Sequence, residues 1–450
     1  MSDPALSYWA DSQGPAPRRT RLPGDSTADV AIIGGGLTGL WTAYYLARAE
    51  PSLRIVVLEK EAVGFGASGR NGGWCSALFP VSAAALEQRY GHEAAVAMRR
   101  AMIDTVDEVG RVAVAEGIDC DYVKGGTVTF ARGPVQLAAA ETEVADAAAF
   151  GTDRIEFWDA DRVGAAGSLG ATFDPTCARV HPLALVRGLA LAVERLGVTI
   201  HEGTEVYRWE PHQVSTRHGT VTAHTIVVAL EGYSATVKQS HRRLLPLYSL
   251  MIATEPLPAA LWDQLGIEHG QTFADFRHLL IYGQRTADDR IAFGGRGARY
   301  HWGSDIRSSY DRSERVFGHL HRALVELFPV LEPIAITHGW GGPLGVPRDW
   351  HASVNHDPAT GLASAGGYVG DGLSTTNLAG RTLRDLILGR ISSLTALPWV
   401  SHRGPDWEPE PLRFLGANAG TLAMSLADSE ERMSRRPSLI ARAMGPLTGH

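Results

Sequence analysis

Lysine and cysteine are both scarce in this chain of 450 residues. Only three of its 42 basic residues are lysines, and the rest are arginines. The lysines are Lys60, Lys124 and Lys238, and the three cysteines are Cys75, Cys120 and Cys177. Three scattered cysteines argue against a disulfide framework or a zinc site, and they predict a reducing, cytoplasmic location. Any reaction step that needs a lysine has only three candidates.

Several other signals are missing. Residues 1–5 lack the basic and apolar regions of a signal peptide, and no apolar run approaches the length of a membrane span, about 18 residues. The formal net charge of −7 indicates no general affinity for nucleic acid. There is no G-x-S-x-G sequence, no metal-binding spacing of His and Glu and no paired-carboxylate motif. We therefore expect neither nucleic acid nor a membrane as a partner, and no bound metal.

The most informative segment that is present begins at Asp29. An apolar strand is followed by Gly34, Gly36 and Gly39 in G-x-G-x-x-G spacing, by a helical pattern over 37–49, and by a second strand that ends on Glu59. These glycines permit a tight turn, close approach of a pyrophosphate and close packing of the helix on the strand. The N–H groups of the helix N-terminus face the phosphates, and Glu59 accepts hydrogen bonds from ribose hydroxyls. The combination predicts a dinucleotide site rather than a chance glycine-rich turn.

The loop directly after Glu59 bears on which dinucleotide binds. Residues 64–75 contain five glycines together with Ser68, Arg70 and Asn71, where a nicotinamide-binding domain would normally continue into another helix. Such a loop allows close backbone contact with a ribityl chain and a flavin ring. A plain surface loop is the alternative, but Trp74, Cys75, Leu78 and Phe79 make its far end apolar.

Three segments of the chain resemble one family. The motif Gly34-Gly-Gly-Leu-Thr-Gly39, the loop Gly66-Ala-Ser-Gly-Arg-Asn-Gly-Gly73 and the late segment 366–380 are similar to those of FAD-dependent oxidoreductases of the D-amino-acid oxidase group. Within that group, which includes glycine and sarcosine oxidases, the gamma-glutamylputrescine oxidase subgroup is resembled most. The resemblance implies an α/β fold in which a Rossmann-like FAD-binding domain is interleaved with an α+β substrate domain built on an antiparallel sheet.

The resemblance also implies a division of the chain. Residues 29–90, 166–240 and 334–395 would form the discontinuous FAD-binding domain, and residues 91–165 and 241–333 the substrate domain. Residues 1–28 are expected to be an arm and residues 396–450 a helical extension. The local patterns predict one long helix over 82–116, a hairpin over 121–130, and strands over 247–253, 276–283 and 290–295.

The fingerprint and the resemblance together predict the FAD contacts. Reduced flavin carries negative charge that the N–H groups of a helix beginning near Leu373 would stabilise, although an ordinary capped helix start is the alternative. A buried strand of no special role is likewise the alternative for the contact at Gly232. The predicted contacts are Gly34, Gly36, Leu37, Thr38, Gly39, Glu59, Lys60, Gly66, Ala67, Ser68, Arg70, Asn71, Gly72, Gly73, Val206, Gly232, Gly370, Gly372, Leu373 and Ser374. FAD is expected to be non-covalent, with a link through Cys75 as the alternative.

The reaction that the resemblance implies is oxidation of a C–N bond in a primary or secondary amine or an amino acid. A hydride passes to flavin N5, and the resulting imine is hydrolysed; no obligatory protein acid or base is needed. The electron acceptor is O₂ or another oxidant, and the strand Arg290 to Arg296 lacks the lysine that assists oxygen in sarcosine oxidases. A flavin-dependent monooxygenase and a non-catalytic FAD-binding subunit are the alternatives.

Candidates for the substrate pocket come from segments that face the flavin in related enzymes. They are Trp74, Tyr248, Tyr282, Trp340 and His351, of which the aromatic residues could form a cage for an amine. Each could instead be an ordinary core residue. Arg277, Arg296 and Arg299 could bind an acidic group of the substrate, with a solvated surface position as the alternative for each.

Overall fold

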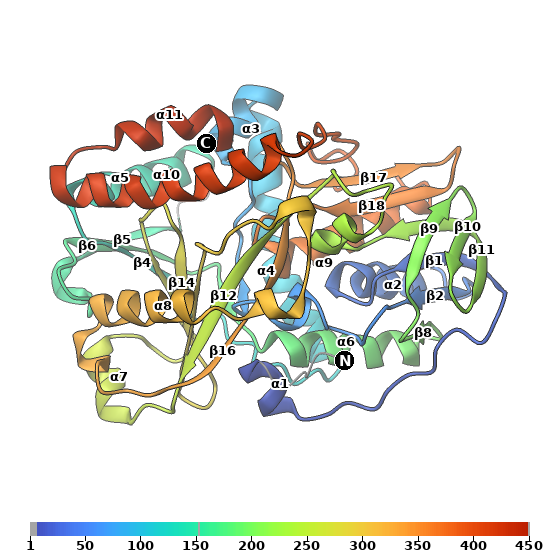
Figure 1. Ribbon diagram of the computed structural model, residues 1–450, viewed down its shortest axis with the longest axis horizontal. Coiled ribbons are helices and arrows are strands. Elements are labelled where there is room, and N and C mark those ends of the chain that lie inside the picture. Colours follow the sequence, from blue (N-terminus) through green and yellow to red (C-terminus); the bar gives the residue numbers. More distant parts are fainter. Residues whose placement is uncertain (1–6, 152–153, 449–450) are drawn as a thin grey trace.

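The computed structural model describes residues 7–151 and 154–448, and its architecture is two eight-stranded sheets side by side (Figure 1). The first sheet contains β1 (Ser26–Ile33), β2 (Ile55–Leu58), β8 (Thr199–His201), β9 (Val206–Glu210), β10 (Gln213–Thr216), β11 (Gly219–Val228), β17 (Ser353–Asp357) and β18 (Leu362–Gly366). The second contains β4 (Thr127–Ala131), β5 (Glu156–Asp159), β6 (Gly170–Asp174), β12 (Leu245–Thr254), β13 (Thr272–Asp275), β14 (Ile281–Arg285), β15 (Ile291–Gly295) and β16 (Ile336–Val346). Strands β3 (Trp74–Cys75) and β7 (Ala178–Arg179) pair separately.

The helices cover the sheets and extend the chain at both ends. They are α1 (Tyr8–Gln13), α2 (Leu37–Ala49), α3 (Ala83–Tyr90), α4 (His92–Ala115), α5 (Pro134–Ala149), α6 (Pro182–Arg195), α7 (Ala259–Leu265), α8 (Glu314–Leu327), α9 (Gly372–Ile387), α10 (Leu412–Ser434) and α11 (Leu439–Thr448). Within the described residues, none of these helices is both long enough and apolar enough to cross a membrane.

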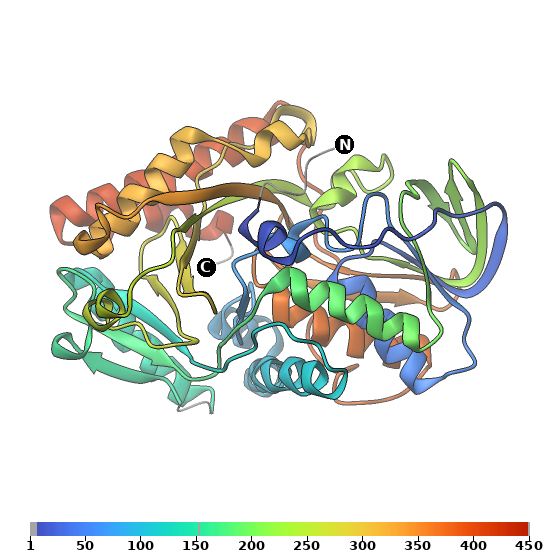
Figure 2. The same cartoon turned by 90° about the horizontal axis from the view of Figure 1, so that it is seen from below.

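The first sheet has the order β17-β18-β11-β1-β2-β8, and the run from β18 to β8 is parallel. Its central strands are apolar on both faces because both faces are covered. Helices α2, α6 and α9 lie side by side on one face (Figure 2), and the antiparallel ribbon β9–β10 folds over the other. The carboxyl ends of β1 and β2 therefore open at one edge, where the glycine turn and Glu59 lie.

The second sheet has the order β16-β12-β15-β14-β13-β4-β6-β5. It is antiparallel except where β13 pairs with β4 in parallel. Helix α8 packs on one face of it, over a core that includes Phe273, Phe293 and Phe328. The expected fold class is confirmed. Strands β6 and β16 lie in this second sheet, so we propose that residues 170–174 and 336–346 belong to the substrate domain rather than the FAD-binding domain.

Three local predictions were wrong. The helix expected over 82–116 is broken at Gly91, whose positive φ of 90° ends α3 and starts α4 at a new angle. The hairpin expected over 121–130 does not form, because Val123 pairs with Arg179 while β4 pairs with the distant strands β6 and β13. The strand expected over 276–283 is a loop up to Leu280, since the chain leaves β13 at Asp275 and enters β14 only at Ile281.

Both terminal segments pack onto the two-sheet body. The arm contains α1, whose Tyr8 and Trp9 are 6% and 1% exposed, so that part of the arm belongs to the core. Residues 396–450 contain α10 and α11, which lie beyond the second sheet at the upper left of Figure 1.

Candidate cofactor and active site

The glycine turn after β1 has the geometry that the fingerprint predicts. Gly34 has a positive φ of 111°, and its N–H donates to the carbonyl of Leu58 at 2.9 Å. A Cβ on Gly39 would lie 2.1 Å from the Gly34 oxygen, so only glycine lets α2 approach β1 this closely. The N–H of Leu37, at the start of α2, donates to Ser68 Oγ at 2.9 Å. The turn and the second glycine loop, far apart in sequence, therefore meet at the N-terminus of α2.

Glu59 holds the other side of this turn. Its carboxylate accepts from the N–H of Gly35 at 2.7 Å and from that of Glu61 at 2.9 Å. Burial raises the pKa of Glu59 to about 7, although both amide hydrogen bonds oppose the shift. The backbone of Glu59 also bonds to His201 and Thr204. The segment that leads to Val206 is thereby brought beside Glu59, and Lys60 forms an exposed ion pair with Glu205 at 2.8 Å.

The loop 64–73 is held mainly by its own backbone and by aromatic neighbours. Asn71 donates to the carbonyls of Ala67 and Ser68 and accepts from the N–H of Gly73. A Cβ on Gly72 would lie 2.5 Å from the Tyr282 ring, and one on Gly73 would lie 2.1 Å from Gln284 Nε2. These glycines let the loop pass directly against β14 of the second sheet.

Arg70 is the charged residue of this loop, and its partner lies in the second half of the molecule. Its guanidinium contacts Asp311 at 2.6 Å and donates to the carbonyl of Gly341 at 3.2 Å. It also lies 4.7 Å from the centre of the Phe65 ring. The two charged side chains are only 13% and 7% exposed. Arg70 therefore links the loop to the segment after Arg307 and to β16.

The late loop between β18 and α9 meets the glycine turn from the other side. The Tyr368 hydroxyl lies 3.1 Å from Thr38 Oγ1 in the first turn of α2. Ser374 Oγ donates to the carbonyl of Ser76 at 2.5 Å. Asp371 precedes α9 but does not cap it through its side chain. Helix α9 thus begins beside the start of α2 and beside the end of the glycine loop.

Glu231 holds the late loop between β18 and α9 through hydrogen bonds to its backbone, and it was not among the predicted residues. Its carboxylate accepts from the N–H groups of Gly367 and Tyr368 at 3.2 and 2.9 Å. Burial raises the pKa of Glu231 to about 7. The signal that could have revealed it is an acidic residue shortly after the end of the buried strand β11 at Val228, next to the predicted contact Gly232.

The N–H groups and polar side chains of these segments are suited to binding FAD. Neither α2 nor α9 is capped by its own N-cap side chain, so both helix starts can offer N–H groups to negative charge, apart from the N–H of Leu37, which donates to Ser68. A Cβ on Gly34 or Gly39 would clash with backbone oxygens, and Ser68, Asn71 and Glu59 supply polar groups around the turn. The residues that would hold FAD are those of the turn, Glu59, the loop 66–73 and the start of α9.

Three predicted pocket residues gather at this loop. Trp74 and Tyr282 meet edge to face with ring centres 6.1 Å apart, and the Trp74 indole N–H donates to the carbonyl of Gly283 at 3.1 Å. The Tyr282 hydroxyl bonds to Ser249 at 2.9 Å. The Trp340 indole N–H donates to the carbonyl of Arg70 at 2.9 Å, so Trp340 also helps to hold the loop 64–73 in place.

The structure does not bring the other two candidates to this cluster. Tyr248 points from β12 to the opposite face of the second sheet, where its ring meets His301 and Tyr310. His351 stacks on His402 with ring centres 4.0 Å apart and bonds to the carbonyl of Ala352. Burial lowers the pKa of His351 to about 4, so it is neutral near pH 7 and packs as a core residue.

The three candidate arginines also differ in whether the structure brings them to the site. Arg277 is held by Asp275 at 2.6 Å, and Arg299 is exposed. Only Arg296 reaches the late loop, where it donates to the carbonyl of Val369 at 2.6 Å. Burial lowers the pKa of the Arg296 guanidinium, and the charge of Asp371 opposes that shift. Burial raises the pKa of Asp371 to about 6, with Arg296 pulling it down.

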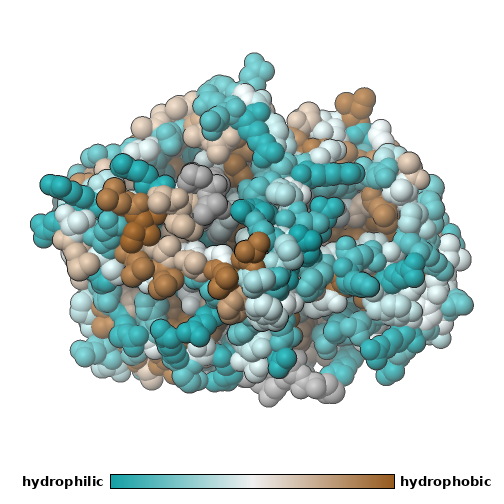
Figure 3. Space-filling model, turned by 45° about the horizontal axis from the view of Figure 1, so that its top comes forward, coloured by the Kyte–Doolittle hydropathy of each residue, from teal (hydrophilic) through white to brown (hydrophobic). Residues whose placement is uncertain are grey.

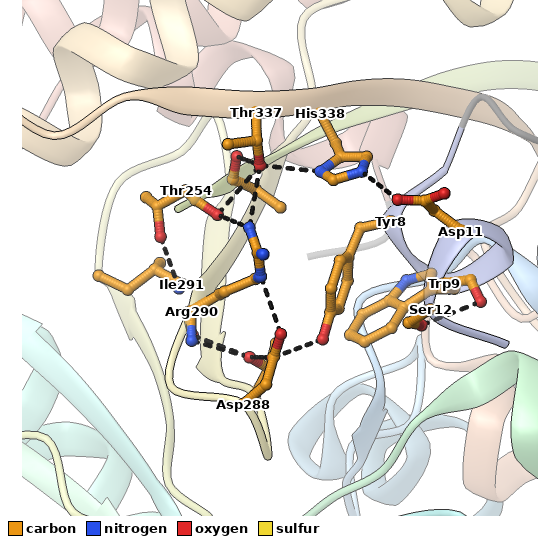
Figure 4. Close-up of polar contacts among 12 residues, drawn as sticks. Tyr8, Trp9, Asp11, Ser12, Thr254, Asp288, Arg290, Ile291, Thr337 and His338 are labelled. Atoms are coloured by element: carbon orange, nitrogen blue, oxygen red, sulfur yellow. Dashed lines mark hydrogen bonds and ion pairs between the residues drawn. The ribbon is translucent and has the colours of Figure 1, made fainter. Parts of the chain in front are cut away.

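Helix α1 holds the glycine loop from the side of the second sheet. The Trp9 indole N–H donates to the carbonyl of Asn71 at 2.9 Å, and the Trp9 ring meets that of Trp340 edge to face. Tyr8 donates to Asp288 in the turn between β14 and β15, while Asp11 pairs with His338 at 3.2 Å (Figure 4). Sequence reasoning missed this helix, because nothing in residues 1–28 indicates which distant groups it contacts.

Comparison with known proteins places this site in a family. Residues 29–386 match the model of the FAD dependent oxidoreductase family. The chain belongs to that family and is a flavin enzyme with FAD as its cofactor, which confirms the resemblance of the three motifs.

Two individual relatives and one solved structure are similar to this chain over most of its length. The chain is 30% identical over 434 residues to gamma-glutamylputrescine oxidoreductase of Escherichia coli (strain K12), an alignment that covers 93% of this chain and 97% of that protein. It is 30% identical over 401 residues to the probable oxidoreductase OrdL of Haemophilus influenzae, covering 85% and 88% of the two chains. Glycine oxidase from Geobacillus kaustophilus superposes with a TM-score of 0.70 at 20% identity, over 84% of this chain and all of that chain.

Proposed function

We propose that this protein oxidises the C–N bond of a primary or secondary amine or of an amino acid. The observation that carries the proposal is the pair Trp74 and Tyr282, which lies directly on the glycine loop. When bound, FAD supplies the two-electron acceptor that takes a hydride from the carbon next to nitrogen. The product is an imine, which water hydrolyses to a carbonyl compound and an amine or ammonia. The name of the relative gamma-glutamylputrescine oxidoreductase supports an amine as substrate.

The residues around the pair support binding of an uncharged amine. The half-buried position of the pair disfavours an isolated ammonium ion, because burial penalises the charged form. Trp74 and Tyr282 are held rigidly through Gly283 and Ser249, so they can orient a small substrate without a large ordering cost. Arg296 carries the positive charge next to the late loop and could hold a carboxylate of the substrate.

Anaerobic reduction of the bound flavin tests the proposal. Loss of the visible flavin absorption on adding members of a panel of primary amines, secondary amines and amino acids is the expected result. Bleaching by NADPH alone would instead identify a monooxygenase, and no bleaching by any donor would identify a non-catalytic FAD-binding subunit. Re-oxidation by air, compared with re-oxidation by an artificial dye, then decides between O₂ and another electron acceptor.

A matched pair of variants tests the position of the pocket. Tyr282→Phe keeps the ring but loses the hydroxyl, and Trp74→Leu removes the aromatic face; we expect slower flavin reduction or weaker substrate binding for Trp74→Leu above all. Tyr248→Phe is the control, because that hydroxyl faces Arg307 on the other side of the sheet. An equal effect of Tyr248→Phe and Trp74→Leu would contradict the placement of the pocket.

A further inference from the structure

The loop that follows η4 (Glu231–Thr236) and the segment that leads into α10 line a cavity of about 420 Å³, which we call the basic cavity. Its volume lies within the range of small-molecule sites, about 300–1,000 Å³. The segment before α10 runs along the top of Figure 1, which Figure 3 brings forward, and the middle of that face is mainly hydrophilic. Every side chain that lines the cavity is polar or charged, and these side chains include Lys238, His241, Arg242, Arg243 and Asp406. Such a lining suits a charged ligand rather than an apolar one.

Hydrogen bonds hold the two walls of the basic cavity in place. His241 Nδ1 donates to the carbonyl of Ala235 at 2.6 Å, which fixes the loop to the end of η4. Arg242 Nε donates to the carbonyl of Trp407 at 2.6 Å, and the N–H of Trp407 donates to the carbonyl of Arg242 at 2.9 Å. The loop and the segment before α10 are therefore joined directly. Cationic side chains on a fixed frame can bind a ligand with a small ordering cost.

The positive charges that line the basic cavity exceed the negative ones. Lys238, Arg242 and Arg243 are cationic, and Asp406 is the acid that lines the cavity with them. Asp406 pairs with Arg243 at 3.4 Å. In the part of the chain that the structure describes, no acid forms an ion pair with Lys238 or Arg242. Two positive charges at the cavity are thus left without a partner.

The other acids of the segment before α10 do not supply the missing partners. Glu408 pairs with Arg348 at 2.9 Å, and Arg242 is a more distant charge that acts on it. Glu410 pairs with the buried Arg413 at 3.3 Å. The protein therefore brings cations together around one hollow without placing an equal number of acids there, although like charges repel one another.

The excess of two charges identifies the chemistry of a ligand. A phosphate monoester carries about −1.5 to −2 charges at neutral pH, which matches the two cations that lack partners. A guanidinium such as that of Arg242 donates to two phosphate oxygens at once, and the ammonium of Lys238 adds a point charge. A phosphate group fills only the space of a few water molecules, at about 30 Å³ each, so the cavity also has room for the rest of a small molecule.

We propose that the basic cavity binds a small phosphate monoester through Lys238 and Arg242. Arg243 adds a weaker contribution, because it already has a partner in Asp406. That pair is 59% and 49% exposed, and exposed pairs are worth little, so a dianion can compete for Arg243. None of the residues that line the cavity is a predicted FAD contact, and neither Trp74 nor Tyr282 lines it. The site is therefore separate from the cofactor and from the substrate of the flavin.

Isothermal titration calorimetry of the full-length, FAD-loaded protein tests the site, with glycerol 2-phosphate as the probe. The wild type should bind one probe molecule per chain, and Lys238→Gln and Arg242→Gln should each weaken binding at least about tenfold. Arg315→Gln on α8, another exposed position, is the control and should bind like the wild type. Lys238 and Arg242 are exposed, so their variants should keep the wild-type melting temperature. A wild type that does not bind the probe, or a Lys238→Gln protein that binds it as tightly as the wild type, overturns the proposal.

A variant that should bind more tightly separates the charge argument from any loss of folding. Asp406→Asn removes the acid of the cavity and releases Arg243, so it should tighten binding of glycerol 2-phosphate at least about threefold. An unchanged or weaker affinity would contradict the charge balance and overturn the proposal.

Two other anions test the chemical class. Dimethyl phosphate carries one charge and should bind at least about tenfold more weakly than the monoester. Succinate carries two charges on carboxylates, and binding as tight as that of glycerol 2-phosphate would overturn the phosphate assignment in favour of a dicarboxylate.

Discussion

The ion pair between Arg70 and Asp311 gives the sharpest test of how the glycine loop is held. Its two charges are 2.6 Å apart and almost fully removed from water, at 13% and 7% exposure. Removing one partner of a buried pair leaves the other charge without compensation, which costs about 3–5 kcal/mol of unfolding free energy. We therefore expect Arg70→Met to lose that amount at neutral pH, although methionine keeps most of the packing against Phe65.

A double variant tests whether the loss of stability comes from the uncompensated charge. Replacing both partners with apolar residues removes the uncompensated charge, and such replacements of buried pairs are often close to neutral. Arg70→Met with Asp311→Leu should therefore recover most of the loss, to within about 1–2 kcal/mol of the wild type. The exposed pair Arg54 and Asp29, at 62% and 35% exposure, is the control, and Arg54→Met should cost less than about 1 kcal/mol.

The pH dependence of the single variant follows from the carboxyl that remains. Burial already raises the pKa of Asp311, and Arg70 opposes that shift. Without Arg70 the pKa in the folded protein rises further above its unfolded value. An acid with a raised folded pKa destabilises the fold as the pH rises through that value, so Arg70→Met should lose less stability at pH 5 than at pH 8.

Urea unfolding of the FAD-free protein, followed by tryptophan fluorescence, measures these free energies, and titration with FAD measures affinity. A double variant as unstable as the sum of the two single variants would refute the reasoning from burial. If the double variant is stable yet binds FAD at least tenfold more weakly, Arg70 contacts the cofactor itself, as the sequence predicted.

Four further predictions concern the cofactor site. Gly39→Ala should cost at least about 1–3 kcal/mol of unfolding free energy and weaken FAD binding, because the new Cβ would lie 2.1 Å from the backbone oxygen of Gly34. Gly24→Ala, which has open space around it, is the control in the same unfolding assay. FAD affinity should fall as the pH is lowered from 8 to 6, because burial raises the pKa of Glu59 to about 7 and only its charged form is a strong acceptor. Glu59→Gln should bind FAD weakly and without this pH dependence. A wild-type FAD affinity that does not change with pH would contradict the prediction. Trp9→Phe should cost about 1–2 kcal/mol by leaving the Asn71 carbonyl without its donor, and Trp9→Ala about 3–5 kcal/mol in thermal or urea unfolding. Equal losses would show that the indole hydrogen bond alone matters and would contradict a packing role for the ring. Acid precipitation should leave all yellow colour in the supernatant, because the Cys75 side chain is buried in the core; coloured precipitate would show a covalent link.

The cofactor half of the site was largely predictable from local sequence. The turn at Gly34 and Gly39, the acid at Glu59 and the helix start at Leu373 each depend on residues a few positions apart, so their geometry is encoded by short segments. The meeting of Ser68 with the start of α2 was not predicted and comes from the structure.

The substrate half was predicted less completely. Tyr248 and Tyr282 lie on strands of the same sheet with similar surroundings in sequence, yet they point to opposite faces. A shift of one residue along a strand reverses the face of a side chain, and no local pattern fixed that choice here. His351 was placed by family resemblance alone, and the structure puts it against His402. Arg70 stays a predicted cofactor contact, and its partner Asp311, which the sequence did not indicate, comes from a segment 241 residues away.

By itself, therefore, the sequence determined the cofactor: glycine spacing, an acid after the second strand and a helix start are properties of neighbouring residues, and they identify FAD and the family. Only the tertiary structure decided how the loop 66–73 is held, through Trp9, Trp340 and Arg70, and which aromatic residues meet beside it. Those contacts join segments that lie far apart in the chain, and they depend on strand register and helix packing, which the residues of one segment do not specify.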